Sequence, residues 1–96
     1  HFPGEHIMPG VLIIEAMAQT GAVAILSMEE FKGRTAYFAG IDKCKFKRKV
    51  IPGDVLKLEA RVVNRIGNLG VAEASATVDG ELACKAILKF AIGNKI

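Results

Sequence analysis

The chain has 96 residues, of which 51% are hydrophobic and 24% are charged, and this composition excludes an intrinsically disordered chain. A chain of this length has room for one core, so we expect residues 1–96 to form a single domain. The formal net charge of +3 suits an acidic partner but is too small to indicate nucleic-acid binding, and the 6% aromatic content argues against a stacking platform for single strands.

The chain begins with an irregular segment, residues 1–10, and continues as an apolar helix from Val11 to about Glu30, with Gly33 as the stop signal. Hydrophobic residues occupy every face of this helix, so we expect protein to surround it. The alternative is a membrane span, but Glu15 would then lie in lipid near the middle of a lone helix, which is costly. We therefore expect no membrane contact.

The rest of the chain alternates between apolar and polar residues with period two, which predicts strands. Turn signals separate the strands at Pro52-Gly53, at Gly67 to Gly70 and at Asp79-Gly80. This pattern predicts an α+β fold in which an antiparallel meander wraps around the helix. The apolar sets expected to share a face are Cys44, Phe46 and Val50; Leu56, Leu58, Ala60 and Val62; Ala72, Ala74, Ala76 and Val78; and Leu82, Cys84, Ala86, Leu88, Phe90 and Ile92.

The chain has two cysteines, Cys44 and Cys84. Their spacing fits neither a metal site nor a disulfide-rich scaffold. We expect buried free thiols in a protein of the reducing cytoplasm, with no metal and no cofactor.

Glu15 is the first candidate for acid–base chemistry, because its neighbours in the helix are apolar. A buried carboxyl group there would be desolvated, which favours its protonated form and suits a general acid. The alternative, in which Glu15 reaches solvent or caps an amide, is equally compatible with the sequence. Gln19 lies one turn later on the same face and could orient Glu15. His1 and His6 are both candidate bases, and their spacing does not distinguish them.

The backbone amides of Gly10 and Val11 open the helix and could bind a developing negative charge. Gly10 would also let a substrate approach the backbone, although an ordinary turn glycine is the alternative. We expect Gly10, Val11 and Gln19 to contact the substrate. A histidine, a carboxyl group and helix-start amides together suit removal of a proton next to a carbonyl, with an acid at the leaving group.

Two segments resemble one enzyme family: HFPGEHIMPGVLIIEAMAQ, from His1 to Gln19, and GIDKCKFKRKVIPGD, from Gly40 to Asp54. They are similar, at matching distance, to the 3-hydroxyacyl-[acyl-carrier-protein] dehydratases called FabZ. The resemblance implies the hot-dog fold, an antiparallel sheet wrapped around a central helix. Relative to that family, the chain lacks an upstream strand and a short helix, and it has Lys49 where the family usually has proline.

The resemblance also implies an activity. His1 matches the family's catalytic histidine, Glu15 its carboxylate, and Gly10 the glycine whose amide binds the thioester carbonyl. The implied reaction removes water from a (3R)-3-hydroxyacyl thioester to give the trans-2-enoyl product, in type II fatty acid biosynthesis and the related lipid A biosynthesis. A Glu at position 15 favours the plain dehydratase over the sister family, which has Asp there and also isomerises. His6 falls at a variable position and is expected to be non-catalytic.

The basic stretch from Lys43 to Lys49 is predicted to dock an acidic acyl carrier protein, chiefly through Lys45, Lys47 and Arg48. A solvated strand face is the alternative. A helix that is apolar on all sides, in so short a chain, predicts a homodimer. The resemblance implies that His1 faces Glu15 of the partner chain, and it also allows a trimer of dimers.

Two further alternatives come from other functional classes. One is a hot-dog thioesterase or enoyl hydratase that acts on coenzyme A thioesters, and the other is a non-catalytic acyl-binding or oligomerisation module. Release of water from a 3-hydroxyacyl substrate, release of a free thiol, or neither distinguishes the three.

Overall fold

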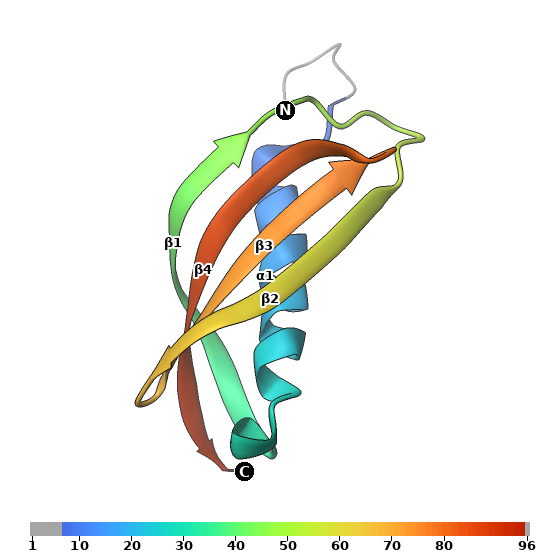
Figure 1. Ribbon diagram of the computed structural model, residues 1–96. Helices are drawn as coiled ribbons and strands as arrows, with labels where there is room; N and C mark the ends of the chain where they lie inside the picture. Colours follow the sequence, from blue (N-terminus) through green and yellow to red (C-terminus); the bar gives the residue numbers. More distant parts are fainter. Residues whose placement is uncertain (1–6, 96) are drawn as a thin grey trace.

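The computed structural model describes residues 7–95, and within them one α-helix lies along one face of a four-stranded sheet (Figure 1). The helix α1 spans Gly10–Leu26, and a short 3₁₀ turn, η1, spans Glu29–Phe31. The strands are β1 (Arg34–Phe46), β2 (Leu56–Ile66), β3 (Leu69–Val78) and β4 (Glu81–Lys95). These elements confirm the predicted α+β fold, an antiparallel sheet curved around a helix.

The strand order across the sheet is β1-β4-β3-β2, and all neighbouring strands are antiparallel. The predicted meander is therefore correct for β2, β3 and β4 but wrong for β1, which pairs with β4. Period-two alternation shows which residues share a face, but it does not show which strands are neighbours. Tight turns keep β2, β3 and β4 adjacent, whereas the longer connection of residues 47–55 crosses from one edge of the sheet to the other (Figure 1).

The turn between β3 and β4 is the predicted one. Asp79 and Gly80 have φ angles of 51° and 78°, as a type I′ hairpin turn requires. Gly67 also has a positive φ, 57°, in the turn before β3, but Gly70 lies inside β3 and does not close that turn as predicted. A Cβ at Gly70 would lie 2.9 Å from Cδ1 of Ile25, so this glycine allows α1 to approach β3 closely.

The helix ends at Leu26, earlier than the predicted end near Glu30. The hydroxyl and the amide of Ser27 both donate hydrogen bonds to the Val23 carbonyl oxygen, at 2.6 and 3.0 Å. The next amide, of Met28, instead donates to the Ile25 carbonyl oxygen three residues back, at 3.1 Å, and this tighter turn marks the end of the helix. The following residues form the separate turn η1, so Gly33, with φ 75°, ends η1 and not α1.

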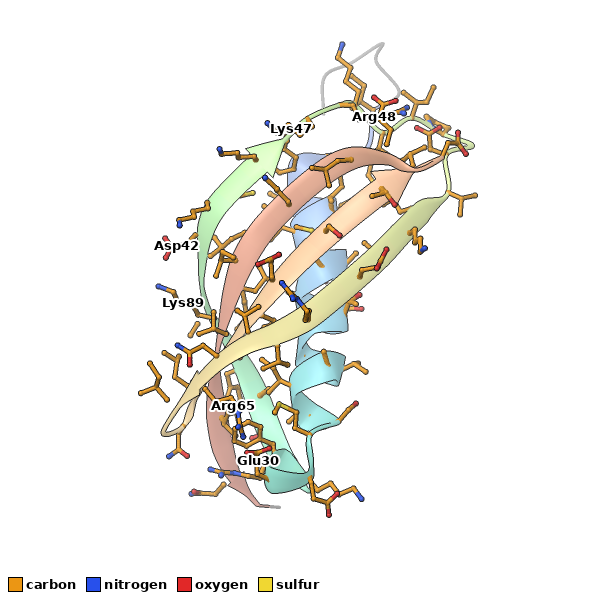
Figure 2. The ribbon with its side chains drawn as sticks, in the orientation of Figure 1. Glu30, Asp42, Lys47, Arg48, Arg65 and Lys89 are labelled. Atoms are coloured by element: carbon orange, nitrogen blue, oxygen red, sulfur yellow. The ribbon has the colours of Figure 1, made fainter. Side chains whose placement is uncertain are left out.

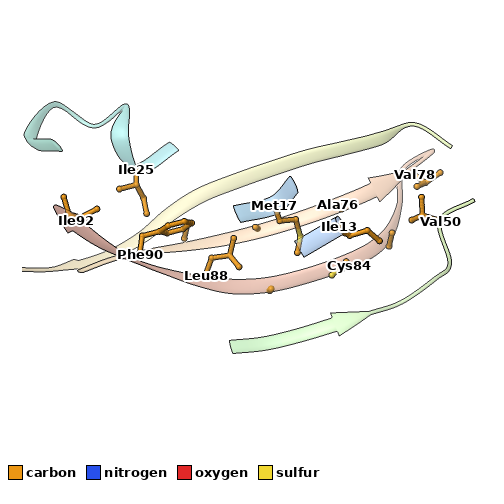
Figure 3. Packing of buried hydrophobic residues seen from close by; sticks show 14 of the residues in the cluster. Ile13, Met17, Ile25, Val50, Ala76, Val78, Cys84, Leu88, Phe90 and Ile92 are labelled. Carbon is orange, nitrogen blue, oxygen red and sulfur yellow. The ribbon is translucent and has the colours of Figure 1, made fainter. Parts of the chain in front are cut away.

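One stripe of α1 packs against the sheet, and its buried members are Ile13, Met17, Gly21 and Ile25. The facing residues of β3 are small, as predicted, and let the helix come close; they are Ala72, Ala74, Ala76 and Val78, all buried. The large side chains of Leu88 and Phe90 from β4 fill the space between them (Figure 3). The core therefore lies between α1 and the two central strands.

The opposite face of α1 is exposed within a single chain. Val11 and Val23 are 71% and 67% exposed. The prediction that protein surrounds the helix is therefore wrong for one chain, because the sheet covers only one side of α1 (Figure 1). Exposed apolar faces of this kind mark interaction sites. No helix among the described residues is long and apolar enough to cross a membrane.

Candidate active site

The start of α1 forms one part of the candidate site. Pro9 is the N-cap residue; no side chain caps the helix, and its first turn holds no acidic residue. The amides of Gly10 and Val11 lie at the N-terminal end of this helix, where its dipole has partial positive charge. Gly10 also faces a cavity of about 460 Å³, which is lined by Ile7, Met8, Gly10, Ile13, Phe46, Lys47, Arg48, Lys49 and Val50.

Gly10 packs against the ring of Phe46, a contact that the sequence did not indicate. A Cβ at position 10 would lie 2.9 Å from Cζ of Phe46. The ring is there because Lys43, with φ 50°, forms a β-bulge that shifts the pairing of β1 with β4. Cys44 packs on the core, and Phe46 shares its face as expected, because Phe46 is the cross-strand partner of the buried Cys84 and contacts α1, although it is 49% exposed.

Glu15 stands beside an apolar groove of about 410 Å³ between α1 and β1. Glu15 and Gln19 are both exposed, so the expectation of a buried carboxyl group is wrong for a single chain. The alternative, a side chain that reaches solvent, describes this residue. The sheet leaves this side of α1 uncovered, and for that reason Glu15 is not desolvated. The groove is lined by Val11, Ile14, Glu15, Ala18, Gln19, Ala22, Ala36, Phe38 and Phe90.

Two phenylalanines that were not predicted as site residues form the far wall of this groove. The rings of Phe38 and Phe90 lie 5.8 Å apart between centroids, and the two residues are cross-strand partners in β1 and β4. Phe90 belongs to a predicted core set, but nothing in the sequence placed Phe38 beside it, because the pairing of β1 with β4 was not foreseen. The groove thus combines an apolar wall with two polar side chains, Glu15 and Gln19.

The two candidate histidines, His1 and His6, lie outside the described residues. Within residues 7–95, the structure brings Val11, Glu15 and Gln19 together along one groove and places Gly10 at the neighbouring cavity. Both hollows adjoin the first two turns of α1. Their arrangement suits a ligand that has an apolar chain and an oxygen able to accept a backbone hydrogen bond.

The three predicted docking residues divide into two groups. Lys45 and Lys47 are exposed and form no ion pair with the described residues. Arg48 is partly buried, and its guanidinium forms ion pairs with Asp54 (3.6 Å) and Glu81 (3.4 Å) (Figure 2). Docking was predicted for all three, but Arg48 is already engaged within the chain.

The thiols of Cys44 and Cys84 lie side by side between β1 and β4. Cys84 is buried, as expected, whereas Cys44 is half-buried. Burial raises the pKa of the Cys84 thiol to about 12, and the adjacent thiol of Cys44 adds to this effect.

The free energy of unfolding should therefore fall as the pH rises above about 9. An unfolded Cys84 loses its proton near pH 9.0 and the folded one near pH 12, so between these values the unfolded state binds fewer protons and is favoured. Denaturant titrations across this pH range would measure the fall. Cys84→Ala is the matched control and should have a shallower dependence on pH; an identical slope in both proteins would contradict the shifted pKa.

The chain is similar to one known protein family and to curated relatives. Residues 1–87 match the FabA-like domain family. The chain is 61% identical over 94 residues to the 3-hydroxyacyl-[acyl-carrier-protein] dehydratase FabZ of Clostridium novyi, covering 98% of the chain and 66% of that protein. It is 61% identical over 95 residues to the FabZ of Staphylococcus saprophyticus, covering 99% of the chain and 66% of that protein. The chain thus spans about two thirds of the length of these curated relatives.

Solved structures share the fold at low sequence identity. The thioesterase HI1161 from Haemophilus influenzae superposes with a TM-score of 0.80 at 19% identity, covering 97% of this chain and 64% of that one. Cj0915, a hexameric hotdog fold thioesterase of Campylobacter jejuni, has a TM-score of 0.77 at 21% identity, covering 99% and 78%. These likenesses confirm the predicted hot-dog fold.

Proposed function

The chain belongs to the FabA-like family, in which its relatives are FabZ dehydratases, and on this premise we propose that it dehydrates (3R)-3-hydroxyacyl-[acyl-carrier-protein] to the trans-2-enoyl product. The observation that carries the proposal is the identity to FabZ proteins across the segment that contains both motifs. The groove between α1 and β1 supports it, since an apolar wall beside a carboxylate suits a hydroxyacyl chain.

Each step of the reaction has a candidate group. His1 would accept the proton from C2, and Glu15 would protonate the hydroxyl as the C3–O bond breaks, so that water leaves and the C2=C3 double bond forms. The Gly10 amide would donate a hydrogen bond to the thioester oxygen, where negative charge develops. Gly10 and Glu15 lie about 7.5 Å apart along the helix axis. Helical side chains lean toward the N-terminus, which brings the Glu15 carboxylate closer to Gly10.

The proposal is tested by incubating the full-length protein with 3-hydroxyacyl-[acyl-carrier-protein] and weighing the carrier-bound acyl group by mass spectrometry. Loss of one water supports dehydration. Release of a free thiol would instead support the thioesterase alternative, and an unchanged substrate would support a non-catalytic acyl-binding module. The thioesterases among the structural relatives do not favour hydrolysis by this chain. They are only 19% and 21% identical to it, so the likeness concerns the fold alone.

An acidic acyl carrier protein is the proposed partner, and the surface charge of β1 supports it. Lys45 lies directly opposite Lys85 of β4, and both are exposed. Like charges at opposed positions of a sheet repel and destabilise it. An acidic partner would offset this repulsion, and its binding would weaken with salt. The proposed carrier-bound substrate and the free thiols of Cys44 and Cys84 both favour a cytoplasmic location.

Reversing Lys45 and Lys47 to Glu should raise the KM for a carrier-protein substrate on the order of tenfold, since each exposed ion pair contributes up to about 1 kcal/mol. The KM for a short thioester without carrier protein should stay the same. Steady-state kinetics at low and high salt would measure both. Lys32→Glu, an exposed reversal next to η1 beyond the C-terminal end of α1, is the control. Equal changes in KM for both substrates would exclude docking at this surface.

A homodimer is the proposed assembly. The outer face of α1 and the free edge of β1 adjoin the groove, and all three are open in one chain. A second copy related by a two-fold axis would cover the apolar face and pair the strand edges. It would also close the groove and desolvate Glu15, which supports a site shared between chains in which His1 of one faces Glu15 of the other.

A further inference from the structure

The connection of residues 47–55 passes over the end of the molecule where α1 begins (Figure 1). Arg48, near its start, contacts three groups: Nη2 lies 3.6 Å from the Asp54 carboxylate, Nη1 lies 3.4 Å from the Glu81 carboxylate, and Nε donates to the Lys49 carbonyl oxygen at 3.2 Å. These contacts join the beginning of the connection to its end and to the β3–β4 hairpin.

The residues around Arg48 also join β4 to the segment that enters α1. The Lys47 amide donates to the Ala83 carbonyl oxygen of β4, and the Met8 amide donates to the Val50 carbonyl oxygen, both at 2.7 Å. Val50 is buried, which holds this end in the core. Residues 47–50, which we call the bridging segment, therefore link β4 to the backbone just before Gly10.

The bridging segment is part of the wall of the cavity that Gly10 faces. Its position sets the distance between that wall and the start of α1. The Asp54 carboxylate, which pairs with Arg48, also accepts a hydrogen bond from the Ile51 amide at 3.0 Å and so holds the residue after the bridging segment. The side chains of Arg48 and Asp54 are only 28% and 17% exposed, so this pair is less screened by solvent than the other ion pairs.

We propose that Arg48 is a positioning residue: its guanidinium fixes the bridging segment and, through the Val50–Met8 hydrogen bond, the place of the Gly10 amide. This inference rests on the proposed function, because the Gly10 amide is the group that would hold the thioester oxygen. Arginine suits the role because its planar group donates in several directions at once, whereas lysine offers a single point charge. Arg48 therefore acts within the chain, and carrier-protein docking rests on Lys45 and Lys47.

The first test compares Arg48→Ala with Arg61→Ala in the full-length protein, since Arg61 is an exposed arginine of β2 that pairs with Glu73. Arg48→Ala should lower kcat by about 10- to 100-fold for the carrier-protein substrate and equally for a short thioester, because a misplaced group costs rate whatever carries the substrate. Arg61→Ala should leave kcat unchanged. Arg48→Lys should fall between Arg48→Ala and the wild type. A rise in KM confined to the carrier-protein substrate for Arg48→Ala would overturn positioning in favour of docking.

A double-mutant cycle tests whether Arg48 acts through Asp54. Asp54→Asn keeps an oxygen that can accept from the Ile51 amide but removes the charge that Arg48 meets. If the pair acts as one unit, the loss in kcat for Arg48→Ala with Asp54→Asn should be smaller than the product of the two single losses. A loss in kcat for the double variant equal to the product of the two single losses would show that Arg48 does not act through Asp54.

Amide hydrogen exchange gives a readout that does not depend on activity. In Arg48→Ala, the amides of Met8 and Lys47 should exchange faster, while those of β3 should keep the wild-type rate, which also verifies that the variant is folded. Unchanged exchange at Met8 would overturn the proposal, as would faster exchange with an unchanged kcat. The two proposals can fail separately. If Met8 exchanges faster in Arg48→Ala but the wild-type protein does not dehydrate the substrate, the structural link through Arg48 is supported and the proposed function is refuted.

Discussion

Replacing Glu15 by Gln should lower the rate of dehydration by about 10²- to 10⁴-fold, the usual contribution of a general acid or base. Glutamine keeps the size of the side chain, but it cannot give a proton to the leaving hydroxyl. The fold should be unaffected, because Glu15 is exposed and forms no ion pair with the described residues. Steady-state turnover of a 3-hydroxyacyl thioester by the full-length protein would measure the loss.

Matched controls separate a chemical role for Glu15 from a loss of charge. Glu29→Gln removes another exposed glutamate, in η1 at the opposite end of α1, and should keep the wild-type rate. His1→Ala should reproduce the loss seen for Glu15→Gln, whereas His6→Ala should not, because His6 is expected to be non-catalytic. Dehydration at the wild-type rate by Glu15→Gln would contradict the role assigned to this carboxylate.

Much of the fold follows from local patterns. The alternation of Ala72, Ala74 and Ala76 predicts a buried, small-residue face, and Asp79-Gly80 predicts a hairpin; both are correct because their causes lie within a few neighbouring residues. The pairing of β1 with β4 was missed because it joins segments far apart in the chain, and no turn signal encodes it.

The candidate site likewise has features that local patterns predict and features that they do not. Gly10, Glu15 and Gln19 follow from the motif and the helical period, and the structure places Gly10 at the cavity and the other two at the groove beside α1. The contacts of Phe46 with Gly10 and of Arg48 with Glu81 could not be predicted, since they depend on a bulge and on a crossing connection. Whether Glu15 is buried depends on what covers the groove, which the sequence of one chain does not contain.

The shared-site hypothesis makes a prediction about mixed dimers. A chain with His1→Ala and a chain with Glu15→Gln are each expected to form inactive dimers, because each lacks one group in both sites. A mixed dimer would hold one site with both groups intact and one site with neither. Co-expression should therefore restore roughly one quarter of the wild-type activity if the chains pair at random in two-fold dimers.

The mixed dimers are isolated by placing a different affinity tag on each chain and purifying through both tags. The matched control pairs a His1→Ala chain with a chain that carries both His1→Ala and Glu15→Gln, since no arrangement of these two chains contains an intact site. Restored activity only in the first mixture would mean that His1 and Glu15 of one site come from different chains. A monomeric mass in solution, or mixed dimers as inactive as their parents, would contradict a shared site; the open groove beside Glu15 would then need some other covering to exclude water from the reacting carbons.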